Sequence, residues 1–240
     1  EQGRLVSRRS GGDLGGELEA PVPGLGYLFE HRFAPGTSEV LLRVATPDPM
    51  VVPIRLMTRD SVEHERQWIA YGYGLVYGFA LALLAYNLML YLGLGQPGYL
   101  RYSLYLGCFL LMNFAYTGHG YGWIWSAWPG FQQYIILAMM ALFSCAGFRF
   151  AIQFLSLPEY APRLVRSING FCLLMLTLMA LAILFQQRYL AVLLAFVYAL
   201  VFSVAMVALG VDAVRRQRPA ARYFFAAACS GMVGVGITTL

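Results

Sequence analysis

The 240-residue chain has little charge for its length. Only 12% of its residues are charged, about half the share of a soluble globular domain, whereas 59% are hydrophobic and the mean hydropathy is +0.61. A single soluble core of this size cannot bury so much apolar side chain. The composition therefore excludes an ordinary soluble enzyme, a disordered tail and a nucleic-acid module, and favours a protein that uses the bilayer as part of its solvent.

Acidic residues are almost absent from most of the chain, and lysine is absent altogether. Residues 1–66 hold ten acids and eight arginines, but residues 67–240 hold nine arginines and only two acids, Glu159 and Asp212. Neither acid lies inside an apolar run, whereas proton-coupled pumps usually need intramembrane Asp, Glu or His. The chain thus divides into a slightly acidic head and a basic, hydrophobic body.

Catalytic and metal-binding signatures are also lacking. There is no Walker A loop, no H-E-x-x-H and no G-x-S-x-G, so no catalytic residue and no cofactor are predicted. The four cysteines lie in apolar stretches without a C-x-x-C pair, as buried hydrophobes do. His31 and His64 are far apart in sequence, so no metal site is expected. His119 either responds to protons or a ligand, or is an ordinary interfacial side chain.

The head has the composition of β structure. Strand-like stretches occur at residues 25–33, 39–45 and 50–57, separated by Pro- and Gly-containing breaks. Two or three strands are too few for an independent domain. We therefore predict that residues 1–60 are part of an extracytoplasmic β-sandwich, joined to the membrane body, residues 68–240, by a polar linker at residues 61–67.

Six apolar segments in the body are predicted to cross the membrane, because about 20 apolar residues span roughly 30 Å of hydrocarbon. They are residues 68–94, 100–117, 131–155, 167–185, 189–211 and 223–240. Short connections predict an antiparallel transmembrane helix bundle in a mainly α protein. Arginines concentrate in or beside the loops after the first, third and fifth segments, which places those loops in the cytoplasm and the head outside.

Four polar side chains inside these segments are candidates for signalling or helix packing. Apart from Arg101 at the edge of the second segment, Arg149 is the only charge within a predicted span, and it either snorkels to the headgroups or contacts Asn87 or Asn113 inside the bundle. Tyr86 and Asn87 lie deep in the first segment, where the amide of Asn87 needs a hydrogen-bond partner. The two side chains either hold neighbouring helices together or form a contact that changes during signalling. Three tyrosines share one face of the second segment and are predicted to line an aromatic belt: Tyr99, Tyr102 and Tyr105.

The strongest charge cluster lies between the fifth and sixth segments and comprises Arg215, Arg216, Arg218 and Arg222. It fixes topology and attracts anionic lipid, or it contacts a cytoplasmic effector. Nucleic acid is not an expected partner, because the cluster is short and a membrane segment flanks it on each side.

Several segments resemble a known family. Residues 71–92 (YGYGLVYGFALALLAYNLMLYL), with Tyr86-Asn87 near the inner end, are similar to the opening helix of the bacterial seven-transmembrane receptors with diverse intracellular signalling modules, the 7TMR-DISM family. Residues 99–105 (YLRYSLY), 118–129 ending in Trp-Pro, and 148–166 (FRFAIQFLSLPEYAPRLVR) resemble its second helix, the following loop and the exit of its third helix. Residues 40–57 and 62–67 resemble the end of its extracellular sandwich.

The resemblance implies a sensory receptor of the bacterial inner membrane. Its head would bind a small extracytoplasmic ligand, such as a sugar or a similar polar molecule. The bundle would signal to an output module that this chain lacks, together with a seventh helix. That module would be a diguanylate cyclase or a histidine kinase, and the receptor would be a homodimer. The alternative is a transporter or channel component, although mid-membrane polar residues are few and scattered.

Overall fold

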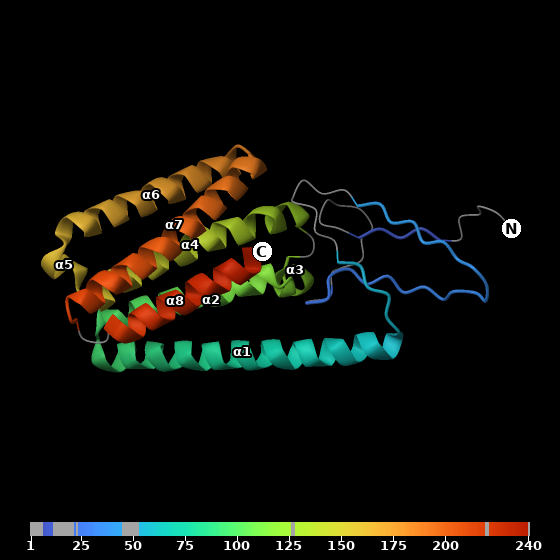
Figure 1. The fold of residues 1–240 in the computed structure, drawn as a ribbon, viewed down its shortest axis with the longest axis horizontal. Helices are drawn as coiled ribbons and strands as arrows, with labels where there is room; N and C mark the ends of the chain where they lie inside the picture. Colours follow the sequence, from blue (N-terminus) through green and yellow to red (C-terminus); the bar gives the residue numbers. More distant parts are fainter. Residues whose placement is uncertain are drawn as a thin grey trace.

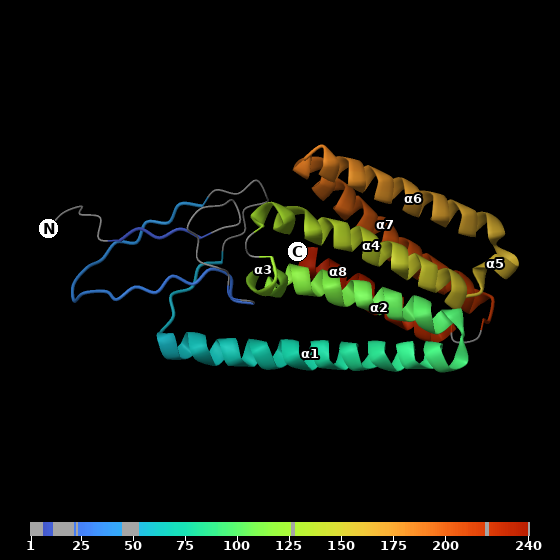
Figure 2. The same ribbon diagram turned by 180° about the vertical axis from the view of Figure 1, so that it is seen from behind.

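The computed structural model describes residues 7–11, 22, 24–44, 53–125, 128–218 and 221–239. The described residues form eight helices, of which six lie side by side in an elongated bundle, with consecutive long helices running in opposite directions (Figures 1 and 2). The N-terminal head extends from one end of the bundle. We call this the head-proximal end, and the opposite end, where α5 lies, the head-distal end.

Helix α1 (Arg59–Leu94) starts earlier than its apolar run. The Thr58 hydroxyl accepts a hydrogen bond from the Ser61 amide at 3.3 Å, which caps the helix. The polar stretch at residues 61–67 therefore forms the first turns of α1. At 1.5 Å per residue the helix is about 54 Å long, so it exceeds the hydrocarbon core and its first turns project beyond it.

Helix α2 (Pro97–Tyr116) packs between α1 and α4 (Pro129–Phe154). Stacked rings form much of its contact with α4. The centroid of Tyr105 lies 4.9 Å from that of Phe143 and 5.9 Å from that of Phe150, and Tyr102 lies 5.3 Å from Phe150. The predicted aromatic belt is therefore wrong for Tyr102 and Tyr105, because both rings pack between helices.

The core lies where α4, α6 (Pro162–Leu184) and α7 (Arg188–Arg215) meet. Ala191 and Ala195 are fully buried, and these small side chains let α7 approach its neighbours closely. The phenol of Tyr198 lies 2.8 Å from the thiol of Cys145 on α4. Because lipid tails are as apolar as the side chains, close packing and such polar contacts stabilise this core more than removal from water does.

Four helices are long and apolar enough to cross a membrane: Arg59–Leu94, Gly130–Phe154, Pro162–Leu184 and Arg188–Arg215. The chain is thus a mainly helical, multi-pass membrane protein. Helix α2 and helix α8 (Ala221–Thr239) coincide with two further predicted segments but are not among these four. Helix α8 packs on α7 and returns toward the head-proximal end (Figure 1).

The described residues of the head contain no β-strand. One isolated antiparallel bridge joins Val22 and Gly26. The described parts of the three strand-like stretches, residues 25–33, 39–44 and 53–57, form no strand, and residues 45–52, which hold the rest of the second and third stretches, lie outside the described part. Because each stretch needs a neighbouring strand for its backbone groups, a few of them do not make a sheet by themselves.

Candidate functional site

The head touches the bundle at a tight turn around Gly24. The amide of Val22 donates to the carbonyl of Gly26 at 2.8 Å, and the amide of Gly26 donates back at 3.0 Å. Gly24 has φ +80°, and a Cβ added there would lie 2.6 Å from Ile69 and 3.2 Å from Tyr73. Glycine is therefore required both by the backbone and by the close approach to α1.

A second segment also reaches α1 near Tyr73. Helix α2 ends at Tyr116, and Gly118 adopts φ +81°, which turns the chain into the short helix α3 (His119–Trp123). This turn brings the ring of His119 against α1, 5.2 Å from Tyr73 and 5.7 Å from Tyr77 between ring centroids. Tyr73 thus lies between the head turn and His119.

The hydroxyl of Thr117 joins three elements. It donates to the carbonyl oxygen of Asn113 at 2.8 Å, and it lies 2.9 Å from the phenol oxygen of Tyr77 and 2.7 Å from Nδ1 of His119. A hydroxyl has one proton and two lone pairs. All three contacts are satisfied together when Thr117 donates to Asn113 and accepts from Tyr77 and from Nδ1–H of His119, and we assign the His119 tautomer on that basis.

Aromatic rings surround His119. Phe114 on α2 stacks on it at 6.2 Å, and Trp123 on α3 packs edge-on at 5.3 Å, in addition to the two tyrosines of α1. Burial among these rings lowers the pKa of His119 below its ordinary value of 6.5. The neutral imidazole is therefore the form that this packing favours near neutral pH.

The same region is tied to α4. The indole of Trp125 donates to the side-chain oxygen of Gln132 at 2.7 Å, and the Gln132 amide donates to the carbonyl of Ala115 at 3.4 Å. A Cβ at Gly120 would collide with the Trp125 ring, so only glycine permits this packing. We use the name junction for the head turn (residues 22 and 24–26) together with Tyr73, Tyr77, Thr117 and His119. A displacement of the head turn would reach α1, α2 and α3 together through it.

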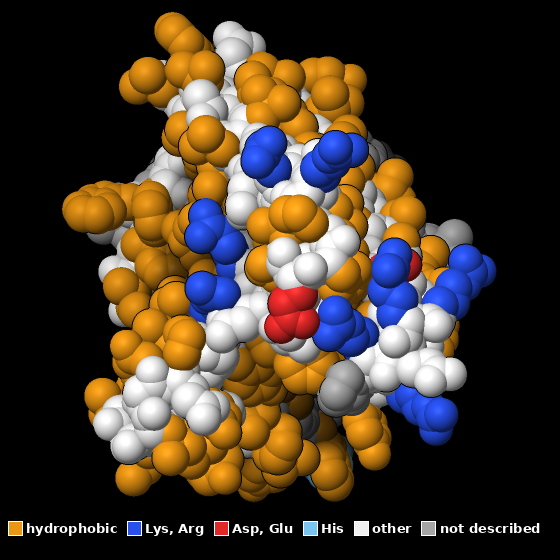
Figure 3. Space-filling model, turned by 90° about the vertical axis from the view of Figure 1, so that its left-hand side faces the viewer, with side chains coloured by type: hydrophobic (Ala, Val, Ile, Leu, Met, Phe, Trp, Pro, Cys, Tyr) orange, Lys and Arg blue, Asp and Glu red, His pale blue; other side chains and the backbone are white. Residues whose placement is uncertain are grey.

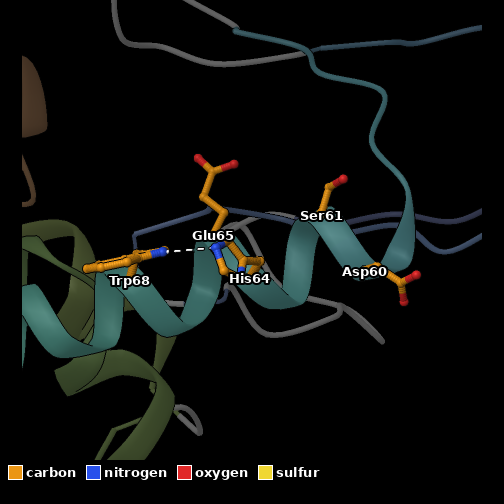
Figure 4. Close-up of a pocket in the computed structure, with 5 residues that line it drawn as sticks. All are labelled: Asp60, Ser61, His64, Glu65 and Trp68. Atoms are coloured by element: carbon orange, nitrogen blue, oxygen red, sulfur yellow. Dashed lines mark hydrogen bonds between the residues drawn. The ribbon is translucent and has the colours of Figure 1, made fainter.

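A shallow depression of about 590 Å³ lies beside the first turns of α1 (Figure 4). Its lining residues are Asp60, Ser61, His64, Glu65 and Trp68, and the Trp68 indole donates to Nε2 of His64 at 3.0 Å. Glu65 also pairs with Arg55 at 3.1 Å. Asp60 and Glu65 point in different directions in Figure 4. Within the described residues, no three His, Cys, Asp or Glu side chains are grouped to hold a metal ion.

Arginines gather at the head-distal end, where α5 (Leu157–Tyr160) connects α4 to α6 (Figure 3). Arg218 pairs with Glu159 at 3.0 Å, and Arg216 pairs with Asp212 at 2.8 Å. Both guanidinium groups also lie over the ring of Tyr160, at 4.6 and 4.8 Å from its centroid. Burial and the charge of Asp212 raise the pKa of Tyr160. This cluster fastens α5 to the turn between α7 and α8.

The predicted site residues occupy different places. Arg215 and Arg222 are exposed at the head-distal end, beside the paired Arg216 and Arg218. Tyr86 is 60% exposed on the face of α1 that no described helix covers. Asn87 is buried, and its amide donates at 2.8 Å to a carbonyl one turn earlier in α1.

Arg149 and Asn113 lie near opposite ends of the bundle and do not meet. The amide of Asn113 donates to the carbonyl of Phe109 at 3.1 Å, within α2. Arg149 is exposed near the head-distal end of α4, and among the described residues no hydrogen bond or ion pair involves it. The contact of Arg149 with Asn87 or Asn113 that one interpretation required is therefore not made here.

Sequence reasoning missed most of the junction. The i, i+4 spacing of Tyr73 and Tyr77 places both on one face of α1 and could have indicated a shared contact. Thr117-Gly118-His119 directly after an apolar run is a helix-end signal. Nothing in the sequence shows that these two patterns, 40 residues apart between Tyr77 and Thr117, come together.

Comparison with known proteins identifies the family. Residues 69–240 match the family described as 7TM diverse intracellular signalling, 7TMR-DISM_7TM. No curated protein and no solved structure matches the chain. The match covers more than half of the chain and includes the long helices of the bundle except the first turns of α1, so the chain belongs to the 7TMR-DISM family of seven-transmembrane proteins with diverse intracellular signalling.

Proposed function

We propose that this chain is the sensory and membrane portion of a receptor, which passes an extracytoplasmic signal to a cytoplasmic output module. Membership of a signalling family supports this proposal, and so does the junction. The head turn lies directly on α1 at Tyr73, and Tyr73 packs on His119. A ligand that moves the head would thereby bias the packing of α1, α2 and α3, and so the balance between two arrangements of the bundle.

The arginine distribution supports an orientation for this receptor. Eight of the nine arginines in residues 67–240 belong to the head-distal ends of helices or to their connections, and Arg188 is at the other end. Cytoplasmic loops carry an excess of arginine and lysine. The proposal therefore has the head-distal end in the cytoplasm and the head outside the bacterial inner membrane.

Six membrane crossings are part of the same proposal. Helices α2 and α8 run alongside the four apolar helices, and their 20 and 19 residues are about the number needed to span the hydrocarbon core. The polar groups that lower the hydropathy of α2 include Arg101 near its head-distal end and Asn113, whose amide is satisfied within the helix. Such groups are tolerated in a helix that spans a bilayer.

The finer parts of the proposal concern partners. A sandwich-type head, a sugar-like or similar polar ligand, a homodimer, and a diguanylate cyclase or histidine kinase output all remain predictions from the family resemblance. A thermal-shift screen of the chain in lipid nanodiscs against sugars and other small polar molecules tests the first step. The expected result is a higher unfolding midpoint with at least one compound class. If no compound stabilises the chain, the proposed small-molecule signal is wrong.

A further inference from the structure

The head-distal end carries far more arginine than its acids can neutralise. Arginines lie on five helices and in one turn of this end: Arg101, Arg149, Arg163, Arg166, Arg215, Arg216, Arg218 and Arg222. The two acids of the body are both already paired, Asp212 with Arg216 and Glu159 with Arg218. Among the described residues, the other six arginines have no carboxylate partner. We call these six the arginine ring: Arg101, Arg149, Arg163, Arg166, Arg215 and Arg222.

The arginines of the ring lie where side chains of a membrane protein meet lipid headgroups. All six side chains are exposed, and each comes from the first or last turns of a long helix. Figure 3 shows the arginine side chains on several sides of the end face, with hydrophobic side chains around them. A helix end next to a long apolar surface lies at the level where lipid phosphates begin.

The two carboxylates at the head-distal end are neutralised by arginines, so they do not repel a bound anion. The carboxylates of Asp212 and Glu159 each accept a hydrogen bond from an arginine, and those two arginines stack on Tyr160. The net charge that remains toward the membrane surface is positive. Guanidinium groups bind phosphate oxygens in a bidentate way, which an ammonium group does not.

We propose that the arginine ring is a binding surface for the phosphodiester headgroups of anionic phospholipids, which surround the head-distal end and hold it at a fixed depth. Each arginine near the surface favours an anionic over a zwitterionic lipid on the order of fivefold. This proposal is independent of the receptor function, because it concerns only the charges and apolar helix surfaces of the bundle.

The test measures lipid selectivity directly. The chain is reconstituted in phosphatidylcholine vesicles that contain a trace of spin-labelled phosphatidylglycerol or spin-labelled phosphatidylcholine. Electron spin resonance then gives the fraction of each label that the protein immobilises. The expected result is a preference for phosphatidylglycerol of several-fold, which falls at high salt because exposed charges are screened.

Two matched double variants separate the arginine ring from total charge. Arg163→Gln with Arg222→Gln should lower the phosphatidylglycerol preference by about half or more. Arg32→Gln with Arg43→Gln removes the same charge from exposed head positions and should leave the preference unchanged. An equal loss in both variants would overturn the proposal. The salt dependence of the unmodified chain tests it even if a variant does not insert.

A competition experiment distinguishes a lipid headgroup from soluble phosphate and from a protein as the partner of the arginine ring. Glycerol phosphate should reduce the preference no more than sodium chloride of equal ionic strength does. A stronger effect of glycerol phosphate would show a site for soluble phosphate. If the unmodified chain shows no preference for phosphatidylglycerol at low salt, the lipid proposal is wrong and the surface is free for an acidic protein partner.

Discussion

The hydroxyl of Thr117 uses its single proton and both lone pairs in the junction. Thr117→Val keeps the shape of the side chain but leaves the donors of Tyr77 and His119 without their acceptor. We expect it to lower the free energy of unfolding by about 1–3 kcal/mol, the cost of unsatisfied, partly buried polar groups. Thr117→Ser keeps the hydroxyl and should recover most of this loss. Reversible unfolding in bicelles measures both variants.

The packing of His119 predicts a pH dependence. Its pKa is lowered in the folded protein by burial among the aromatic rings of Tyr73, Tyr77, Phe114 and Trp123, and no charged side chain of the described residues bonds to it. The unfolded chain therefore takes up the proton first as the pH falls below about 6.5, and stability is lost from there downward.

The variant His119→Gln separates the effect of His119 on stability from that of the other two histidines. In His119→Gln the part of the acid destabilisation that belongs to His119 disappears, whereas His31 and His64 are left in place. The measurement is the unfolding midpoint between pH 8 and pH 5, a range that brackets the ordinary histidine pKa. Identical pH profiles for both proteins would contradict the assigned role of His119.

At the scale of elements, the turn between α2 and α3 depends on one glycine. Gly118 has φ +81°, a conformation that costs an L-residue about 1–2 kcal/mol. Gly118→Ala should therefore destabilise α3 and raise amide exchange in residues 119–123. Gly122→Ala is the control, because Gly122 is helical and has open space around it, so alanine there should be neutral or slightly stabilising. Equal exchange in the two variants would contradict the account.

The long helices were largely predictable from the sequence, and the reasons for the misses are local. Apolar runs locate the helices, but α1 begins at Arg59 because a Thr58 cap and good helix formers extend it beyond its apolar part. The spacing of Tyr102 and Tyr105 predicts a common helix face but does not show which neighbouring helix covers that face. The three-way contact of Thr117 depends on tertiary packing that no local pattern encodes.

The orientation of the whole molecule in the membrane can be tested by cysteine labelling. With the head outside, Arg32→Cys should react in intact spheroplasts with a thiol reagent that cannot cross membranes, whereas Arg163→Cys should react only after lysis. The four natural cysteines lie within the helices α2, α4, α6 and α8 and are the background in the unmodified chain. The reverse pattern would contradict the proposed orientation.

In the proposed receptor, the junction and the head-distal end respond to one another. Coupling between two sites is reciprocal, so a change at the junction must alter the other end even without a ligand. Tyr73→Ala removes the side chain between the head turn and His119. Tyr86→Ala is the matched control, because Tyr86 lies on the same helix, 60% exposed, and outside the junction.

The decisive measurement is amide hydrogen exchange of the chain in nanodiscs, followed in α5 and in residues 216–218. Tyr73→Ala should raise exchange in both segments, and Tyr86→Ala should leave them as in the unmodified chain. If Tyr73→Ala raises exchange in α3 while α5 and residues 216–218 stay unchanged, the junction does not reach the cytoplasmic end and the proposed signalling route is wrong.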